Sequence, residues 1–273
     1  SIEILQVSKE IIEKNILDSA LDNKIKVEKI YGIEGVFTIP YYYCELGITN
    51  KILSLAISDF EQIDENVENL IKKFEKKNNI NFGKVQKEAI EGAFENGIEI
   101  ITGGPGTGKT TIIKCIIDIF EKCGFSVALG APTGRAAKRM SESTGREAKT
   151  IHRMLEMGIR DDKDFALFLE DETILKADVI IIDEASMIDV IVMNSLLKAI
   201  KSGTRFIIVG DIDQLPSVGP GNVLRDLIES DFTKVVRLDE IYRQGKESMI
   251  VINAHKINKG EMPILNLSLI HIS

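Results

Sequence analysis

The chain has 273 residues, of which 44% are hydrophobic and 28% charged, and its formal net charge is −8. This composition excludes a disordered chain and predicts a globular protein with one domain of ordinary size and a smaller one. The negative charge argues against a protein that is basic all over, although nucleic-acid binding depends only on the local field at the binding groove.

Cysteine spacing and hydropathy indicate the compartment. The three cysteines show no metal-binding spacing. If Cys115 and Cys123 share a helix, they lie about 12 Å apart, which is too far for a disulfide. We therefore expect reduced thiols in a cytoplasmic protein. No signal peptide is visible and the apolar runs are too short to cross a membrane, so no membrane partner is expected.

Residues 1–60 are predicted to form a small winged-helix-like accessory domain. Residues 8–22 place apolar side chains at helical spacing behind a candidate serine cap. Residues 25–39 carry apolar runs on both sides of a glycine-containing turn, which predicts a hairpin, and a second helix is expected from about Tyr42 to Asp59. Such units bind nucleic acid in some proteins and only pack against a motor core in others. The sequence leaves both hypotheses open.

Two further segments flank the main domain. Residues 61–81 are strongly polar with a thin apolar stripe, which predicts a linking helix that frays near Lys76, with a domain boundary close to Asn78. Residues 263–273 are interpreted as a truncated end. Their final stretch, "LSLIHIS", resembles a translated sequencing adaptor rather than evolved sequence. The alternative is an ordinary terminal strand.

Residues 82–262 alternate short apolar strands with amphipathic helices, which predicts an α/β domain. Strands are expected at residues 98–102, 126–131, 178–183, 205–210 and 234–238. Most of these runs are almost wholly apolar, as expected for a mostly parallel sheet with helices on both faces. Ligands of such a domain bind beyond the carboxyl ends of the strands.

The first strand runs directly into "GGPGTGKTT", residues 103–111, which fits the phosphate-loop pattern GxxxxGK[ST]. A glycine-rich turn lets backbone N–H groups approach phosphate oxygens, and the following helix adds the positive end of its dipole. Lys109 is expected to reach the β- and γ-phosphates and Thr110 to ligate Mg²⁺. The motif therefore predicts a P-loop NTPase that uses ATP and Mg²⁺. The nucleotide-binding residues are expected to be Gly104, Pro105, Gly106, Thr107, Gly108, Lys109, Thr110 and Thr111.

The third strand ends in "IIIDEASM". Asp183 is expected to hold Mg²⁺ through its water shell, because this ion prefers a few carboxylates together with phosphate oxygens. Glu184 is placed to orient and deprotonate a water for attack on the γ-phosphate. One acid for the metal and one for the water predict hydrolysis. The alternative is that the pair only caps the following turn.

Two segments are ambiguous by themselves. The loop "VGDIDQLPSVGPG", residues 209–221, is rich in turn residues, so Gln214 has either a chemical role or none, and Asp211 either bonds backbone N–H groups or touches the shell of the metal. Residues 131–153 form a cationic segment that is either a solvated helix face or a binding surface. In that segment Arg135, Lys138, Arg139, Arg146, Lys149 and Arg153 face only Glu142 and Glu147.

The ordered series "GGPGTGKTT", "APTGRAAKRM", "KTIHRML", "IIIDEASM", "VGDIDQLPSVGPG" and "LDEIYRQ" resembles the superfamily 1 helicases, most closely the RecD-like DNA helicases, over about residues 85–244. The resemblance implies a RecA-like first motor domain over residues 82–262. It also implies ATP hydrolysis coupled to tracking along single-stranded DNA, expected 5′ to 3′, in DNA repair or recombination.

The same resemblance assigns residue roles. Besides Lys109 and Glu184, it implies that Gln214 senses the γ-phosphate and that Arg243 stabilises transition-state charge. Gln86 matches a glutamine that reads the adenine edge; the alternatives are an exposed helix residue for Gln86 and a surface arginine for Arg243. The residues implied to contact DNA are Pro132, Thr133, Gly134 and Arg135 in one loop and Thr150 and His152 in a second turn.

Superfamily 1 helicases clamp ATP between two RecA-like domains, and no second one is visible in this sequence. We therefore expect an amino-terminal fragment that binds ATP·Mg²⁺ weakly, hydrolyses it poorly and does not unwind duplexes. Three alternatives stay open: a P-loop switch or assembly ATPase without a DNA track, the helicase module of a conjugative relaxase, and a binding module in which the accessory domain is the functional part. Other DNA-repair proteins are open as partners.

Overall fold

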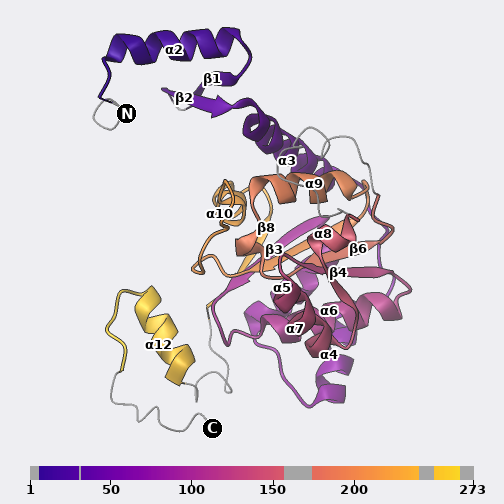
Figure 1. The fold of residues 1–273 in the computed structure, drawn as a ribbon. Helices are drawn as coiled ribbons and strands as arrows, with labels where there is room; N and C mark the ends of the chain where they lie inside the picture. The colour runs from indigo at the N-terminus through magenta and orange to yellow at the C-terminus, as the bar shows by residue number, and fades with distance from the viewer. Residues whose placement is uncertain (1–5, 31, 157–173, 240–248, 265–273) are drawn as a thin grey trace.

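The computed structural model describes residues 6–30, 32–156, 174–239 and 249–264 (Figure 1). Its centre is a six-stranded sheet in the order β5-β4-β6-β7-β3-β8. All neighbouring strands of this sheet pair in parallel, as the apolar runs predict. The strands are β3 (Ile98–Gly103), β4 (Val127–Ala131), β5 (Ala148–Thr150), β6 (Val179–Ile182), β7 (Arg205–Gly210) and β8 (Lys234–Leu238).

Helices cover both faces of the sheet, which confirms the predicted α/β fold class. Each face has its own apolar core, because successive residues of a strand point to opposite faces. Ile100 of β3 packs in one core and Ile101 in the other. One face is covered by α4 (Val67–Asn78), α5 (Lys84–Glu95), α6 (Lys109–Lys122) and α7 (Gly134–Thr144), and the other by α3 (Ile39–Ile57), α8 (Ile151–Met154), α9 (Val190–Ala199) and α10 (Val223–Glu229).

The five predicted strands are present at the predicted places, and a sixth strand was not predicted. This strand, β5, has three residues and pairs with β4 from Leu129↔Ala148 to Ala131↔Thr150. Its sequence, Ala-Lys-Thr, carries no apolar run, because the strand lies at the edge of the sheet and none of its residues is fully buried. Periodicity therefore gives no signal for it.

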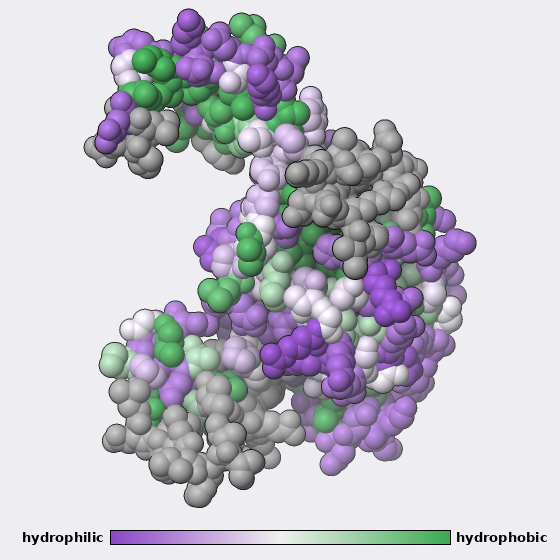
Figure 2. Space-filling view, in the orientation of Figure 1, coloured by the Kyte–Doolittle hydropathy of each residue, from purple (hydrophilic) through white to green (hydrophobic). Residues whose placement is uncertain are grey.

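The amino-terminal part stands away from the sheet (Figure 1). Helix α2 (Lys9–Leu21) has no buried residue. The hairpin of β1 (Ile25–Ile30) and β2 (Ile33–Thr38) is antiparallel, with Ile25 opposite Thr38. We call α2, β1 and β2 together the arm. Figure 2 shows apolar surface on the arm, to which the exposed side chains of Ile11, Leu17 and Leu21 belong.

Helices α3 and α4 pack onto the sheet domain. Helix α3 begins at Ile39, earlier than predicted, because Pro40 is suited to a first helical turn. Its residues Ile48, Ile52 and Leu55 belong to one core. Helix α4 starts at an Asn66 cap and ends at Asn78. The division of the chain at residues 60 and 81 stays a prediction.

Three other segments complete the described structure. Helix α12 (Met249–Asn258) lies below the sheet in Figure 1, and the amide of Asn258 donates to Asp213 Oδ2 at 3.5 Å. A short 3-10 turn, η2 (Ala185–Met187), follows β6. Residues 263 and 264 are described, but the tail "LSLIHIS" lies outside the described residues. Within the described part of the chain, no helix is both long and apolar enough to cross a bilayer.

Candidate nucleotide and nucleic-acid site

Five predicted segments meet at one edge of the sheet. Because its strands are parallel, their carboxyl ends share that edge. The phosphate loop follows β3, Asp183 follows β6 and the Gln214 loop follows β7, and these three strands are neighbours in the order β6-β7-β3. The two segments implied to contact DNA follow β4 and β5 on the other side of β6. The sheet order therefore places the acids of the β6 turn between the two groups.

The phosphate loop has the backbone that its glycines predict. Gly106 and Gly108 have φ of +80° and +91°, the left-handed region where other residues are strained. The buried hydroxyl of Thr107 donates to the carbonyl oxygen of Gly104 at 2.9 Å and closes the turn. Helix α6 begins at Lys109, directly after Gly108, so its free N–H groups face the loop.

The ammonium group of Lys109 is folded against this loop. It donates to the carbonyl oxygens of Gly103 and Gly104, the latter at 3.0 Å. Burial lowers the pKa of Lys109, and the negative charges of Asp211, Asp183 and Glu184 partly oppose that effect. A buried ammonium group beside a glycine-rich loop and the first turn of a helix is suited to phosphate oxygens.

Gln86 is buried against the phosphate loop. Its side chain is 4% exposed, so the alternative of a plain exposed residue is wrong. Its Oε1 accepts from the N–H of Gly83 at 3.0 Å, and its Nε2 donates to the carbonyl oxygen of Thr107 at 2.9 Å. A Cβ at Gly108 would collide with the same Nε2. Gln86 therefore joins the start of α5 to the loop, and its role toward adenine stays a prediction.

The carboxylates after β6 occupy different environments. Asp183 Oδ1 accepts from the N–H of Glu184 at 2.8 Å, and burial raises the pKa of Asp183. Glu184 has φ of +56°, an uncommon value for a glutamate, and its Oε1 lies 3.8 Å from Nη1 of Arg139 on α7. A backbone held in a sparsely populated region is found where a side chain is being aimed.

The donor set fits Mg²⁺. Asp183 stands at the strand end, and the hydroxyl side chain of Thr110 is exposed in the first turn of α6. Among the described residues, no group of three or more His, Cys, Asp or Glu side chains is placed to hold a metal alone. That arrangement suits Mg²⁺, which keeps several waters and takes ligands from a few protein groups and from phosphates.

Asp211 organises the Gln214 loop. Its side chain is 2% exposed, its Oδ1 accepts from the N–H of Asp213 at 3.0 Å, and its Oδ2 accepts from Nε2 of Gln214 at 3.3 Å. The hypothesis that Asp211 bonds a backbone N–H group within the loop is therefore confirmed. The hydroxyl of Thr102, at the end of β3, accepts from the N–H of Ile212 at 3.3 Å. Thr102 was not among the predicted site residues, although a polar residue at a strand end beside a phosphate loop is a usable signal.

The residues implied to contact DNA are brought together. Ala131 and Thr150 are register partners, so Pro132 and the turn after Thr150 are adjacent. The hydroxyls of Thr133 and Thr150 cap α7 and α8, accepting from the N–H groups of Ala136 and Arg153, each at 3.2 Å. Exposed at this surface are Gly134, Arg135 and His152.

The cationic segment divides into two groups. Arg146 is bound to Glu121, with Nη2 and Oε2 2.6 Å apart, and is directed toward α6. Lys138 lies 3.9 Å from Glu142 on its own helix. Arg135 and Lys149 are exposed, and no ion pair involving them is found in the described part of the chain. Arg243 lies outside the described residues.

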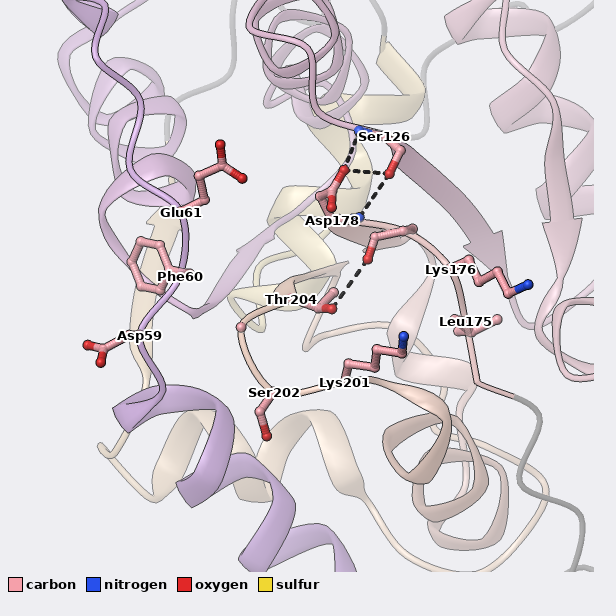
Figure 3. Close-up of a pocket in the computed structure, with 12 residues that line it drawn as sticks. Asp59, Phe60, Glu61, Ser126, Leu175, Lys176, Asp178, Lys201, Ser202 and Thr204 are labelled. Carbon is pink, nitrogen blue, oxygen red and sulfur yellow. Dashed lines mark hydrogen bonds between the residues drawn. The ribbon is translucent and has the colours of Figure 1, made fainter.

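A pocket of about 450 Å³ lies at the opposite edge of the sheet (Figure 3). Its lining includes Ser126, Asp178 and Thr204, which stand at the beginnings of β4, β6 and β7. The Asp178 carboxylate accepts from Ser126 Oγ at 2.6 Å, so this edge is fastened by its own side chains. The pocket is separate from the phosphate loop, because the loop follows the other end of the strands.

Comparison with known proteins gives similar relatives over the same region. Residues 86–220 match the family model described as an AAA domain. The chain is 42% identical over 164 residues to the ATP-dependent RecD2 DNA helicase of Deinococcus radiodurans, covering 60% of this chain and 22% of that protein. It is 35% identical over 204 residues to the RecBCD enzyme subunit RecD of Mycobacterium tuberculosis, covering 64% and 35%.

Among solved structures, the Pif1 helicase from Candida albicans has a TM-score of 0.48 and 22% identity, over 67% of this chain and 45% of that chain. The chain spans 22% and 35% of the lengths of the two curated relatives above. Those relatives confirm the predicted resemblance to the RecD-like helicases over the motor region.

Proposed function

We propose that this RecD-like chain is the ATP-binding motor region of a DNA helicase that couples ATP hydrolysis, with Mg²⁺, to tracking along single-stranded DNA in DNA repair or recombination. The observation that carries the proposal is the order β5-β4-β6-β7-β3 at one sheet edge. It sets a phosphate loop, two acids, the Gln214 loop and two capped turns side by side. We expect 5′ to 3′ movement from the resemblance.

Residues at the carboxyl ends of β3 and β6 take different roles in the proposed ATP hydrolysis. The backbone N–H groups of the loop and the start of α6 bind the β- and γ-phosphates, and Lys109 exchanges its two carbonyl partners for phosphate oxygens. Asp183 and Thr110 would hold Mg²⁺, which would neutralise charge on the triphosphate. Glu184 orients and deprotonates the attacking water.

An ion pair links the two halves of the edge. Arg139 lies on α7, whose first turn carries the implied DNA residues Thr133 to Arg135, and its guanidinium is 3.8 Å from Glu184. We infer that DNA binding at the start of α7 acts through this contact on the acid that activates water. This contact supports a DNA-dependent ATPase over a switch ATPase that has no DNA track.

Single-strand binding at several salt concentrations tests the proposal. Phosphate contacts release counterions, so the affinity falls as salt rises, by a slope of roughly 0.7 per contacted phosphate on a log–log plot. We expect measurable ATP·Mg²⁺ binding and salt-dependent binding of an oligothymidine. Binding of ATP with no affinity for the oligonucleotide at low salt would favour the switch ATPase instead.

A further inference from the structure

The Gln214 loop is hydrogen-bonded at both of its ends and contacts helix α9. At one end Asp211 holds Gln214, with the 3.3 Å bond between their side chains. At the other end Ser217 Oγ contacts the carbonyl oxygens of Gly219 and Gly221 at 3.1 and 3.2 Å. These bonds order each end of the loop separately, and Leu215 and Pro216 are the residues that connect the two ends along the chain.

The far end of this loop touches the first turn of α9. The N–H of Val190 donates to the carbonyl oxygen of Pro220 at 3.0 Å. A Cβ on Gly219 would overlap the carboxylate of Asp189, the residue that caps α9 by accepting from the N–H of Val192 at 2.8 Å. Loop and helix are therefore in direct contact through one backbone hydrogen bond and through the carboxylate of Asp189.

The opposite side of α9 packs closely against α3. Asn194 of α9 donates to Sγ of Cys44 at 3.5 Å. Its Oδ1 lies 2.5 Å from the position that a Cβ on Gly47 would take, so only glycine fits there without a shift. Asn194 is 4% exposed. A closely packed contact of this kind transmits displacement because protein interiors have low compressibility.

The carboxyl end of α3 is fixed at the other edge of the sheet. A Cβ on Gly97 would overlap the carbonyl oxygen of Leu55. After α3 the chain passes Asp59, Phe60 and Glu61 beside the Ser202–Thr204 turn (Figure 3). There the buried guanidinium of Arg205 donates to the carbonyl oxygen of Glu61 at 2.5 Å and lies 4.3 Å from the ring centre of Phe60.

The amino end of α3 carries the arm. Helix α3 follows β2 without a break, and the ring of Tyr42 lies 6.0 Å from Phe37 and 5.9 Å from the ammonium of Lys26. The hairpin is thus fastened to the first turn of α3. In Figure 1 this end of α3 extends past the sheet, and the arm stands beyond it.

The geometry points to α3 as a lever that the Gln214 loop drives through Asn194 and that moves the arm with the nucleotide state. The inference rests on the proposed function of Gln214. Gly47 lies about 12 Å along the helix from Leu55, and Thr38 about 26 Å, at about 1.5 Å per residue. A helix shift of about 1–2 Å at Gly47, the usual size for such transitions, therefore becomes roughly 2–4 Å at the hairpin.

The test measures the distance between two labels, one on the arm and one on the sheet domain, which we call the body. Labels are placed by Lys29→Cys on β1 and Lys114→Cys on α6, in a Cys123→Ser background. Burial raises the pKa of Cys44, and that of Cys115 to about 12, so these thiols do not compete for the label. A second pair, Lys114→Cys with Glu229→Cys on α10, reports movement within the body. The ligand is a non-hydrolysable ATP analogue with Mg²⁺.

We expect the analogue to shift the arm distance by about 2–4 Å and to leave the body pair unchanged. Asn194→Ala should at least halve the arm shift with unchanged affinity for the analogue. Ser195→Ala is the matched control, because among the described residues Ser195 Oγ donates only to the carbonyl oxygen of Ile191 in its own helix. Gly47→Ala places a Cβ against Asn194 Oδ1 and should change the arm distance in the absence of the analogue. Combining it with Asn194→Ala removes that overlap and should restore the distance. The double variant also provides a test if either single variant folds poorly.

Three outcomes overturn the lever, and calorimetry with the same analogue separates the last of them from the first two. Binding of the analogue with an unchanged arm distance, or a shift that Asn194→Ala leaves intact, contradicts the lever and spares the proposed function. Absence of binding contradicts the proposed function, and the lever is overturned with it.

Discussion

Nε2 of Gln86 donates to the carbonyl oxygen of Thr107 at 2.9 Å, and this bond joins helix α5 to the phosphate loop. Both atoms are buried, and the other end of the amide accepts from the N–H of Gly83. The shape of the loop therefore depends on a side chain that precedes it by 21 residues.

Replacing Gln86 tests that dependence. Gln86→Ala removes two side-chain hydrogen bonds, of which the one to Thr107 is buried, and leaving a buried polar group unpaired costs about 1–3 kcal/mol. We expect the affinity for ATP·Mg²⁺ to fall at least tenfold by calorimetry, that is by about 1.4 kcal/mol. Gln62→Ala removes an exposed glutamine that lies between α3 and α4 and should leave the affinity for ATP·Mg²⁺ unchanged. Equal affinities for the two variants would contradict the role of Gln86.

Glu184→Gln separates binding from hydrolysis. The amide keeps the size and the turn but cannot accept a proton, so the residual hydrolysis rate should fall about 100-fold or more. The affinity for ATP·Mg²⁺ should stay within about twofold, because Glu184 is not assigned to the phosphates or the metal. Release of phosphate in single-turnover experiments gives the rate. The matched control is Glu142→Gln on the outer face of α7, and an undiminished rate in Glu184→Gln would remove that residue from catalysis.

Arg135→Ala tests the proposed DNA surface. Arg135 is exposed at the start of α7, so its loss should weaken binding to an oligothymidine and reduce the salt slope by about 0.7. Arg146→Ala removes the same charge where Glu121 already neutralises it, so it should have the smaller effect. Fluorescence anisotropy across a salt series measures both. If the two variants behave alike, the effect is one of net charge and not of this surface.

Glu99 makes stability depend on pH. It lies in β3 with neither carboxylate oxygen hydrogen-bonded, and burial raises its pKa well above 4.5. Lys234 opposes that shift, whereas Glu88 and Glu95 add to it. A raised folded-state pKa means that the stability from this group is present below pH 4.5 and is lost as pH rises through the folded-state value, at about 1.4 kcal/mol per pKa unit.

Glu99→Gln cannot ionise and should escape this loss. Urea unfolding should show a variant that gains stability over the wild type as pH rises from about 5 to 8. Glu34→Gln, at an exposed position of β2 that has no part in the Glu99 shift, should follow the wild type. If the free energy of unfolding of Glu99→Gln and that of the wild type change in parallel with pH, the pKa of Glu99 is not raised in the folded state.

Local chemistry explains why the main domain could be predicted. The apolar runs fix the strands, and the phosphate-loop glycines at positions 106 and 108 have the positive φ that the motif requires. The sequence placed Asp183 and Gln214 at the correct edge because each follows a parallel strand. Strand ends are therefore the most informative positions in a sequence of this class.

Long-range contacts explain what could not be predicted. A charged residue such as Glu99 within a strand is expected to face solvent. The packing of α5 against β3 shows that it is buried. The bonds from Gln86 to Thr107 and from Asn194 to Cys44 join residues 21 and 150 positions apart, and no local pattern marks them. The same holds for α4, whose apolar stripe looks thin until the sheet domain against which it packs is known.

The most direct measurement is calorimetric titration of the chain with ATP·Mg²⁺, compared with Lys109→Ala and with Lys114→Ala as the control. Lys109 is folded into the phosphate loop, whereas Lys114 is exposed on the same helix. The proposed function predicts saturable binding by the wild type and Lys114→Ala and none by Lys109→Ala. Unchanged affinity in Lys109→Ala would contradict a nucleotide site at this loop.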